Sequence, residues 1–587
     1  MTLSTLDWAL IIGFFVLFAI IGIAVAKRSG KDTKEFFLSG RNMPWWLLGI
    51  SMVATTFSAD TPNLVTDIVR QNGVSGNWVW WAFLITGMLT VFVYAKLWRR
   101  SKVLTDLEFY EMRYSGKAAA FLRGFRALYL GVFFNVMIMA AVCLAAIKIG
   151  GVMFGLTPLE CVLYAGLVTV IYSTLGGLRG VIFTDFLQFI VAMIGSIWAA
   201  YYIVNMPEIG GLDAMLSHPN VADKLSFFPD FNDNKSLIIL LIIPIAVQWW
   251  SVWYPGSEPG GGGYIAQRML SAKDEKNAIG ATLLYNVAHY ALRPWPWILI
   301  ALASLVLYPE LSDIGNEFPD AVLGHDLGYS AMLTNLPPGL LGIVIASLIA
   351  AFMSTISTHL NWGSSYVSLD FYKRFVKPEA SEKELVAVGR FSTVVLMLLA
   401  GLIALFLSDA LSTFQILLQI GAGTGLIFIL RWFWWRVNAY SEITGMIVSF
   451  VMALIFEFTE LGLEDYEKLV LGVGITTLSW IAVTLLTRPT DSKTLSKFYN
   501  TVTPYGSGWK PFKRKAAAQD ITLKTTNDVF TIDFASMLLG IVCVYTTLFA
   551  TGYIIYGNML GAGILIAIAV ITGFTIFKLW RRKKKQS

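Results

Sequence analysis

One apolar segment carries a row of hydroxyl groups with the spacing of a cation-binding face. Ala351, Ser354, Thr355 and Thr358 are three or four residues apart, so in a helix they lie on one side. Carbonyl and hydroxyl oxygens suit a monovalent hard cation that must also leave again. The same hydroxyls would alternatively bond to their own helix or join neighbouring helices. The ion hypothesis therefore needs unpaired backbone oxygens opposite this face.

Such oxygens are expected where the second predicted helix is interrupted. Between Ala54 and Asn63 this segment carries hydroxyls, the carboxylate of Asp60 and Pro62 at mid-depth. Irregular backbone is tolerated inside a membrane only where protein or a water-filled cavity surrounds it. Packing of the hydroxyl face against unwound backbone near Ala54 and Phe57 would create a site of neutral oxygens.

A second interruption lies in the seventh predicted helix, where Pro255, Gly256, Glu258 and Pro259 precede a run of glycines. Proline and glycine at this density cannot continue a regular helix. The two broken helices are five helices apart and cross the membrane in opposite directions, so they head two halves of inverted topology. This pattern is typical of secondary transporters with a site at the midplane, whereas a single break would indicate only a kink.

Several charged side chains remain inside the predicted membrane segments. Asp185 has no basic residue nearby in sequence, which indicates either a functional acid or a protonated structural one. Asp60, Glu258 and the pair His289 and Arg293, one helical turn apart, would recognise polar groups of a substrate or neutralise one another.

Tryptophans crowd the helices around both breaks. Some belong to the interfacial belt, and others would form aromatic walls for a sugar ring or an onium group. These tryptophans are Trp78, Trp80, Trp81, Trp249, Trp250 and Trp253.

The elements that hold these residues follow from composition. The chain has 587 residues, of which 56% are hydrophobic and only 14% charged, with a mean hydropathy of +0.65. Soluble proteins carry roughly 25% charged residues, and here apolar runs long enough to cross a ~30 Å hydrocarbon core recur along nearly the whole chain. This excludes soluble enzymes, nucleic-acid binders and disordered scaffolds, and predicts an all-α polytopic membrane protein.

The three cysteines and four dispersed histidines indicate neither a disulfide framework nor a metal centre.

Hydropathy and turn signals predict about fifteen transmembrane helices. No basic region precedes the first apolar run, so that run is expected to be a retained helix and not a cleaved signal peptide. The expected ranges are 7–27, 44–71, 77–98, 121–150, 157–175, 181–206, 237–256, 277–308, 337–371, 386–408, 411–435, 439–459, 466–487, 532–556 and 559–580.

Loop charges orient these helices, because cytoplasmic loops carry the excess of Lys and Arg. The loop 96–126 has eight basic and three acidic residues, whereas 309–335 has five acidic residues and no Lys or Arg. The pattern predicts an outer N-terminus and an inner C-terminus with the basic tail 581–585. The loop 488–530, with eight basic and three acidic residues, is expected to be a solvated inner linker. Alternatively, its basic run 513–515 would bind anionic lipid headgroups.

The predicted helices and loops divide the chain into seven parts. They are an N-terminal accessory helix with a cytoplasmic loop (1–43), the first five-helix inverted repeat (44–206), an extracellular loop (207–236), the second five-helix repeat (237–435), accessory helices (436–487), a cytoplasmic basic loop (488–531), and C-terminal accessory helices with a basic tail (532–587).

Five motifs add information that no single residue carries. They are 36–46, 176–180 with 184–188, 264–268, 354–358 and 370–374. Together, over about residues 7–450, they resemble the sodium:solute symporter family, which includes sodium-coupled transporters for glucose, galactose, sialic acid, proline and inositol. The resemblance implies a LeuT-type 5+5 inverted repeat with one extra N-terminal and about four extra C-terminal helices. It also implies sodium-driven uptake by alternating access.

Motif by motif, the resemblance implies a main sodium site. Its ligands would be the backbone carbonyls of Ala54, Phe57 and Ala351 and the hydroxyls of Ser354 and Thr355. Some relatives bind a second sodium, and the matching ligands here would be Asp185, Ser354, Ser357 and Thr358.

The resemblance says less about the substrate. Asp60 matches the position of a substrate-binding glutamate in galactose-transporting relatives, but Thr61 and Pro62 replace their Gln-Phe and the second break is longer. The expected substrate-binding residues are Asp60, Thr61, Trp78, Trp81, Trp249, Trp253, Tyr254, Glu258, His289, Arg293, Gln415 and Gln419.

The sequence therefore predicts a transporter of the cell membrane and not an enzyme. The favoured function is sodium-coupled symport of a small polar solute, with a sugar or sugar derivative preferred. Arg293 keeps an anionic sugar acid, a carboxylate or an amino acid open as the solute, and a membrane sensor with a transporter fold is the non-transporter alternative. The expected partners are Na+, a sugar-like small molecule and the lipid bilayer, without nucleic acid; monomer and homodimer both stay open.

Overall fold

The computed structural model describes residues 3–29, 38–525 and 530–586. Of these, the side chains at 18–19, 21–29, 168, 171–180 and 582–586 are not described. Lys31, Lys34 and the start of the motif 36–46 therefore lie outside the described residues. So do the side chains of the motif 176–180 and of the tail beyond Arg581.

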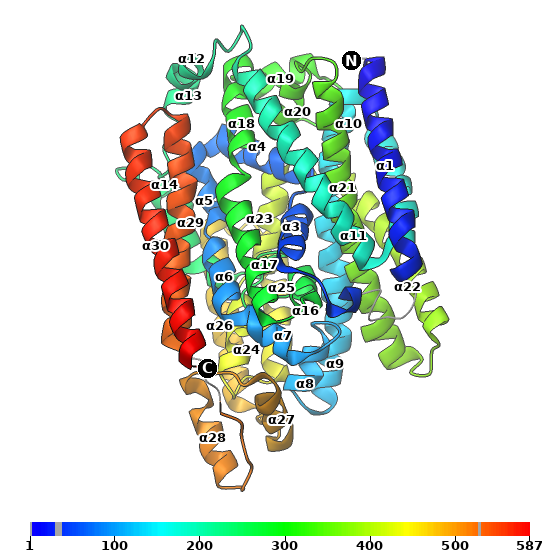
Figure 1. The fold of residues 1–587 in the computed structure, drawn as a ribbon, viewed down its shortest axis with the longest axis vertical. Coiled ribbons are helices and arrows are strands. Elements are labelled where there is room, and N and C mark those ends of the chain that lie inside the picture. Colours follow the sequence, from blue (N-terminus) through cyan, green and yellow to red (C-terminus); the bar gives the residue numbers. More distant parts are fainter. Residues whose placement is uncertain (1–2, 30–37, 526–529, 587) are drawn as a thin grey trace.

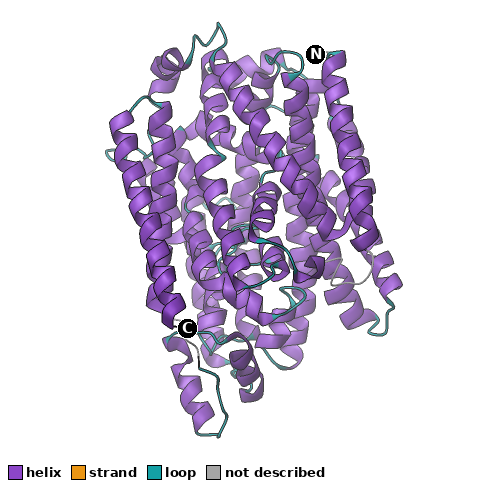
Figure 2. Cartoon of the chain, viewed as in Figure 1, coloured by secondary structure: helices purple, strands orange, loops and turns teal. Residues whose placement is uncertain are grey.

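Within the described residues the architecture is helical, with backbone pairing between extended segments limited to two isolated bridges (Figure 2). Eleven helical stretches there are long and apolar enough to cross a membrane. They are Val74–Ser101, Gly116–Phe154, Val181–Val204, Asn234–Ser251, Glu275–Leu307, Leu340–Val376, Glu382–Ala404, Ala439–Phe458, Asp465–Leu486, Phe530–Ile555 and Met559–Arg581. The predicted all-α polytopic membrane protein is thus confirmed.

Shorter apolar helices fill the remaining expected positions. They are Thr5–Leu17, Trp45–Thr56, Pro158–Leu167 and Ala410–Ile420. Each of the fifteen predicted ranges overlaps one of these long or short stretches.

The helices up to the second break fall into the following segments. They are α1 (Thr5–Ser29), α3 (Trp45–Thr56), α4 (Asp60–Asn72), α5 (Trp78–Trp81), α6 (Leu84–Leu89), α7 (Ala95–Ser101), α8 (Glu108–Arg113), α9 (Gly116–Leu128), α10 (Asn135–Phe154), α11 (Pro158–Val204), α12 (Leu212–Ser217), α13 (Pro219–Ala222), α14 (Asn234–Leu237) and α15 (Trp249–Ser251).

The second part of the chain continues in the same way. Its helices are α16 (Gly263–Ser271), α17 (Glu275–Val287), α18 (Trp295–Leu307), α19 (Leu311–Glu317), α20 (Leu327–Leu333), α21 (Leu340–Ser365), α22 (Glu382–Ala404), α23 (Ala410–Ile420), α24 (Gly425–Phe433), α25 (Ala439–Phe458), α26 (Asp465–Leu486), α27 (Ser492–Val502), α28 (Lys510–Ala517), α29 (Phe530–Ile555) and α30 (Met559–Gln586).

π-helical and 3-10 turns join several of these segments. The π turns are η3 (Thr90–Tyr94), η4 (Tyr129–Phe134), η5 (Ile238–Ile242), η6 (Pro244–Gln248), η7 (Ala288–Leu292) and η8 (Tyr366–Val376). The 3-10 turns are η1 (Ser39–Arg41), η2 (Val74–Asn77) and η9 (Ser507–Trp509).

The helices predicted over 157–175 and 181–206 form one helical segment, α11. Its start is fixed by a capping box: the Glu160 N–H donates to Thr157 Oγ1 at 3.3 Å, and the Thr157 N–H donates to the Glu160 carboxylate at 2.9 Å. Pro158 follows at the first helical position, where its missing N–H has no cost. The turn predicted between the two helices is therefore helical, although its side chains are not described.

The ends of the bundle differ in charge. The N-terminus, α12, α13, α19 and α20 lie at one end, and the C-terminus, α8, α27 and α28 lie at the other (Figure 1). The acidic loop 309–335 thus shares an end with the N-terminus, and the basic segments 96–126 and 488–530 contribute to the opposite end.

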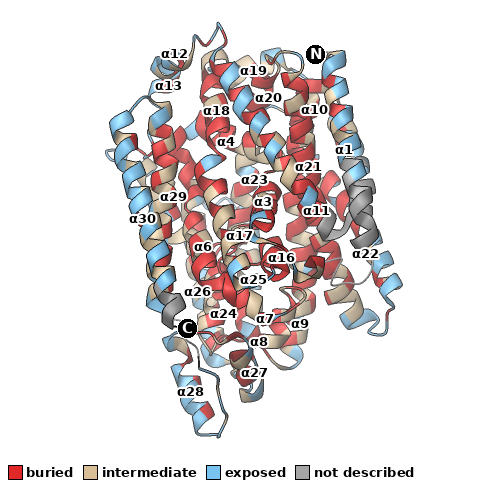
Figure 3. Ribbon diagram, viewed as in Figure 1, coloured by how far each residue is buried: buried red, intermediate tan, exposed pale blue. Residues whose placement is uncertain are grey.

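Burial separates a packed centre from a lipid-facing surface (Figure 3). The central helices α3 and α21 are mostly buried, whereas α1 and α30 lie on opposite flanks with many exposed residues. Large apolar side chains such as Phe406, Leu478 and Leu486 are 70–88% exposed. Exposed apolar surface on this scale indicates contact with hydrocarbon, not water.

Both predicted helix breaks are present. Helix α3 ends at Thr56 and α4 begins at Asp60, with Phe57 in a non-helical conformation. Pro62 lies in the first turn of α4, where no intrahelical acceptor faces its position. The second break separates α15 from α16, and Gly256, Gly260, Gly261 and Gly263 in it have positive φ angles. A side chain is strained in that conformation, so glycine is required here.

The segment predicted as a solvated linker is folded. It contains α27 and α28, and Trp509 at its centre is fully buried, with Nε1 donating to the Trp432 carbonyl at 2.7 Å. Phe498 and Phe512 are also completely buried. Aromatic residues scattered in a basic stretch thus anchor it to the end of α24.

Candidate ion and substrate site

The predicted hydroxyl face lies on α21, in the packed centre of the bundle. Ser354, Thr355, Ser357 and Thr358 are each no more than 3% exposed. Thr355 Oγ1 donates to the Thr55 carbonyl at 3.1 Å. The structure therefore places this face against the end of α3, as the sequence predicts.

The end of α3 supplies backbone oxygens to this contact. The last carbonyls of a helix have no intrahelical donors beyond its final turn. Here the Phe57 N–H turns back to the Val53 and Ala54 carbonyls at 2.8 and 3.1 Å, and the chain then leaves the helix. Ala54, Phe57 and Ala351 are each 2% exposed. The five expected sodium ligands are thus buried and come from two helices in contact.

The hydroxyl protons on this face point away from one another. Ser354 Oγ donates to Asp185 Oδ1, and Thr355 Oγ1 donates to the Thr55 carbonyl. A hydroxyl that donates elsewhere still offers its lone pairs. Both side chains therefore fit the role of cation ligands.

Asp185 has a basic partner that its sequence neighbourhood does not contain. Arg268 of α16 lies 3.5 Å from Asp185 Oδ2, and both side chains are fully buried. Ser51 Oγ donates to Asp185 Oδ2 at 2.6 Å, and Arg268 Nε donates to Ser51 Oγ at 2.9 Å. The guanidinium also bonds to Thr55 Oγ1 at 2.7 Å and Thr358 Oγ1 at 3.3 Å. A resident guanidinium thus contacts two of the four expected ligands of a second sodium.

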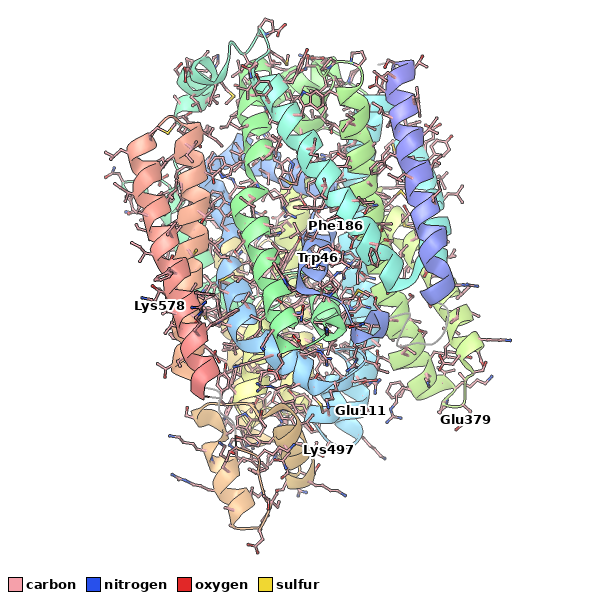
Figure 4. The ribbon with its side chains drawn as sticks, viewed as in Figure 1. Trp46, Glu111, Phe186, Glu379, Lys497 and Lys578 are labelled. Carbon is pink, nitrogen blue, oxygen red and sulfur yellow. The ribbon has the colours of Figure 1, made fainter. Side chains whose placement is uncertain are left out.

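The same region of α3 and α11 also contains an aromatic contact. Trp46 and Phe186 lie edge to face, with ring centroids 5.5 Å apart (Figure 4). Phe186 directly follows Asp185 in α11, so its ring lies on the neighbouring part of the helix surface.

A cavity of about 90 Å³ lies between the two broken helices. Its volume admits several water-sized groups. Both Thr55 and Thr355 line it, so it borders directly on the expected sodium ligands. Five of the expected substrate-binding residues also line it: Asp60, Thr61, Tyr254, His289 and Arg293.

Polar groups in the cavity form a connected set. His289 Nδ1 lies 3.2 Å from Thr56 Oγ1, and Arg293 Nη1 donates to that same hydroxyl at 3.3 Å and to the Val53 carbonyl at 3.4 Å. Asp60 Oδ1 and Arg293 Nε have no hydrogen-bond partner among the described residues. These atoms are available to a polar solute.

One wall of the cavity is aromatic. Trp80 stacks on Tyr290 with ring centroids 5.8 Å apart and an interplanar angle of 22°, and it meets His289 edge to face at 5.7 Å. His289 and Tyr290 belong to the π turn η7, which changes the helical register and turns both side chains to the cavity. Tyr254 packs against Phe414 on another side, with ring centroids 4.9 Å apart.

Other expected substrate residues lie outside this cavity wall. Trp78 Nε1 donates to the Phe227 carbonyl at 2.9 Å. Trp253 packs on Phe134, with ring centroids 4.7 Å apart. Gln419 Nε2 donates to the Asp465 carbonyl at 3.0 Å.

Four more expected residues complete this group. Trp81 is fully buried beside Trp78 and Trp80, and the Trp249 carbonyl accepts a hydrogen bond from Thr86. Gln415 is half-buried on α23 outside the wall. Glu258 lines a smaller neighbouring cavity.

Sequence reasoning missed several lining residues. Tyr285, Tyr290 and His359 line the cavity, and Trp80 does so in place of its neighbours Trp78 and Trp81. The four-residue spacing of Tyr285 and His289 was a usable signal, because it puts both on one helix face. The choice among three tryptophans depends on the turn at 82–83, which hydropathy does not reveal.

Residues 36–449 match the model of the sodium:solute symporter family. The match covers more than half of the chain.

The chain belongs to this family.

The symporter is 25% identical to a sodium/glucose cotransporter of Vibrio parahaemolyticus over 472 residues, which cover 77% of this chain and 85% of that protein. It is 25% identical to a sodium/sialic acid symporter of Proteus mirabilis, covering 76% of this chain and 89% of that one. A sodium/myo-inositol cotransporter of Canis lupus familiaris is 26% identical, and the match covers 77% of this chain and 67% of that protein. Membership makes the protein a sodium-coupled solute symporter, a multi-pass membrane transporter and not an enzyme.

The fold of the symporter agrees with its family. A solved structure of a Na+-coupled sialic acid symporter in a substrate-bound outward-open state superposes with a TM-score of 0.66 at 21% identity, covering 83% of this chain and 99% of that one. This likeness confirms the all-helical membrane fold of LeuT type.

Proposed function

We propose that the symporter couples inward movement of sodium to uptake of a neutral sugar or sugar derivative. The observation that carries the proposal is a cavity with both kinds of surface that a sugar needs. The stacked Trp80 and Tyr290 offer an aromatic wall, while Asp60 and His289 offer polar partners. A sugar ring has apolar faces edged by hydroxyls, which fit such a combination. Relatives named for glucose and myo-inositol support this substrate class.

Sodium would bind at the main set of ligands, between the α3 break and α21. Because Thr355 both belongs to that set and lines the cavity, the ion would act on the substrate site directly. Bound sodium would tie α21 to the end of α3 and order the cavity wall. Coupling requires only that the ion favours the outward-open, substrate-competent state, and release to the inside would then loosen the contact.

Asp185, Ser354, Ser357 and Thr358 would form a second sodium site only after Arg268 withdraws. The guanidinium already supplies a positive charge to Asp185 in this conformation. If Asp185→Asn leaves the number of sodium ions transported per solute unchanged, this second site should be dropped.

We also propose how the symporter lies in the membrane. About fifteen crossings, with the two parts of α11 over 157–175 and 181–206 counted separately, an outer N-terminus and an inner C-terminus would place the basic end of the bundle in the cytoplasm, where Lys and Arg are in excess. Residues 44–206 and 237–435 would form the two inverted halves, with the broken helices at corresponding positions.

An anionic sugar acid or carboxylate is the rival substrate class. Arg293 favours it, because its guanidinium lines the cavity and its Nε has no partner in the described part of the chain. The Asp60 carboxylate in the same cavity opposes an anion. Selective loss of anion binding in Arg293→Gln, with binding of neutral sugars intact, would support the rival.

The experiment that tests the substrate class is a thermal-shift screen of the purified symporter. Neutral sugars, sugar acids and amino acids would each be added with sodium and with choline. We expect stabilisation by a neutral sugar only when sodium is present. Stabilisation by a sugar acid instead would favour the anionic substrate class. Stabilisation that is the same with sodium and with choline would contradict sodium coupling.

A further inference from the structure

The second helix break encloses an acid that the proposed sodium set does not use. Glu258 is 2% exposed, and neither of its carboxylate oxygens has a hydrogen-bond partner among the described residues. The backbone N–H groups of Gly256 and of Glu258 itself lie near it, outside hydrogen-bond geometry. An ionised carboxylate buried without a partner is costly, so either a proton or a cation belongs beside it.

A cavity of about 10 Å³ adjoins this carboxylate. A cavity of this size holds a single water-sized species. It is lined by side chains from three parts of the fold: the helix formed by α6 and η3, the second break, and α17 with η7. Besides Glu258, its polar side chains include Thr86, Thr90, Thr282 and Asn286.

The polar groups of this cavity face it as acceptors. Asn286 Nδ2 donates to the Thr282 carbonyl at 2.8 Å, and the buried Asn286 Oδ1 has no hydrogen-bond partner among the described residues. Thr282 Oγ1 donates to the Ala278 carbonyl at 2.9 Å, and Thr90 Oγ1 donates to the Thr86 carbonyl at 3.0 Å.

Two further hydroxyls of the lining are turned away in the same manner. Thr86 Oγ1 donates to the Trp249 carbonyl, and Tyr285 Oη donates to the Gly256 carbonyl at 3.0 Å. Because the protons of these four hydroxyls are already used, Thr86, Thr90, Thr282 and Tyr285 can offer only lone pairs to an occupant. Lone pairs converging on one small space, with a carboxylate among them, are the ligand set of a small cation.

A neighbouring acid shows the contrast. Asp106 also approaches the glycine run, and its two oxygens accept from Tyr366 Oη and from the Gly263 N–H at 2.9 Å. Protein donors thus satisfy Asp106, whereas neither carboxylate oxygen of Glu258 has a hydrogen-bond partner among the described residues. In the described part of the chain, no Lys, Arg or His forms an ion pair with Glu258 within 4.0 Å.

We propose that Glu258, Asn286 and the hydroxyls of Thr86 and Thr282 form an additional sodium site inside the second helix break. It is separate from the main set on α21 and from Asp185. One carboxylate with neutral oxygens suits a monovalent ion. In addition, no group of three or more His, Cys, Asp or Glu side chains that could hold a metal ion occurs in the described residues.

The location gives the site a role in coupling. Gly256, Tyr285 and Tyr290 line both this small cavity and the larger substrate cavity. An ion bound at Glu258 would therefore fix the wall that holds the stacked Trp80 and Tyr290. This inference rests on the proposed sodium coupling and adds to the main site an ion that is distinct from the one proposed at Asp185.

The test is equilibrium binding of radioactive sodium to the purified full-length symporter, with Glu258→Gln, Thr355→Ala and the double variant beside the wild type. Each single variant is expected to bind one sodium fewer, and the double variant two fewer. Asp106→Asn is the control, a buried neighbouring acid whose sodium count should not change. Failure of Thr355→Ala to lose an ion would contradict the main site, whereas failure of Glu258→Gln to lose one would overturn the site proposed here.

Thermal stability provides a second readout that a merely structural acid would not give. A glutamine at 258 removes the charge that the wild type must bury, so Glu258→Gln is expected to be at least as stable as the wild type without sodium. Its stabilisation by sodium should be smaller than that of the wild type.

If Glu258→Gln does not fold, Asn286→Ala is expected to weaken this site by about tenfold, and unchanged sodium affinity would overturn the proposal. A third outcome would assign the cavity to a proton. In that case Glu258→Gln would bind as many sodium ions as the wild type, and only the wild type would show pH-dependent stability.

Discussion

Arg268 lies 3.5 Å from Asp185, and neither side chain has measurable exposure to solvent. The pair joins α16, which follows the second break, to α11, and its hydrogen bonds reach Ser51 on α3 and Thr358 on α21. Four helices that carry the proposed sodium and substrate sites are thus tied together at one buried ion pair. Any movement of the breaks during transport must change these bonds.

Breaking this pair should be costly. Asp185→Asn leaves a guanidinium buried without its counter-charge, and loss of one partner of a buried pair typically lowers the free energy of unfolding by about 3–5 kcal/mol. Denaturant unfolding of the purified variant measures this change.

A double-variant comparison separates the pair from general damage. Arg268→Gln combined with Asp185→Asn should restore part of the lost stability, because no charge is then left unpaired. Strictly additive losses would show that the two side chains do not stabilise one another.

Thr355 should control the response to sodium. Thr355→Ala removes one ligand of the main set, and we expect the sodium concentration for half-maximal uptake to rise by about tenfold or more, equivalent to about 1.4 kcal/mol. Thr355→Ser keeps the hydroxyl and should behave like the wild type. An alanine variant with an unchanged sodium response would remove Thr355 from the ion site.

Trp80, and not Trp78, should affect solute affinity. Trp80→Ala removes the ring stacked on Tyr290, and an aromatic contact of about 0.5–1.5 kcal/mol corresponds to about a two- to twelvefold rise in KM for the solute. Trp78→Phe should leave KM unchanged, because Trp78 lies outside the cavity wall. The reverse pattern in uptake kinetics would favour the positions expected from sequence.

The basic end of the bundle should lose stability in acid. Burial raises the pKa of Glu111, but hydrogen bonds from Arg374 and Arg123 outweigh it and hold the pKa below its ordinary value of 4.5. The stability from this carboxylate is therefore present above pH 4.5 and is lost as the pH falls through the lowered value. Glu111, labelled in Figure 4, lies on α8 at the end opposite the N-terminus.

The acid effect is checked by melting temperature between about pH 7 and 3. Glu111→Gln should lower the melting temperature at neutral pH and flatten its acid dependence. Equal acid sensitivity in both proteins would mean that other groups dominate.

The positions of the helices and of both breaks could be predicted from the sequence, because hydropathy, proline and glycine determine the backbone conformation locally. The sequence also placed Thr355 on a face that meets α3. It did not reveal Arg268 beside Asp185, since that contact depends on how α16 packs against α11 after the second break. The substrate wall was equally hidden, because a π turn and a short irregular turn change which side chains of two helices face the cavity.

The central claim is that a sodium gradient drives solute uptake through the Thr355 contact. The direct measurement is uptake into proteoliposomes of the solute identified by the thermal-shift screen, under an imposed inward sodium gradient. We predict accumulation above the external concentration with wild type and Thr355→Ser, its loss when the gradient is collapsed, and weaker accumulation with Thr355→Ala at the same sodium concentration. Accumulation that persists without a sodium gradient, or in Thr355→Ala with an unchanged sodium response, would contradict the claim.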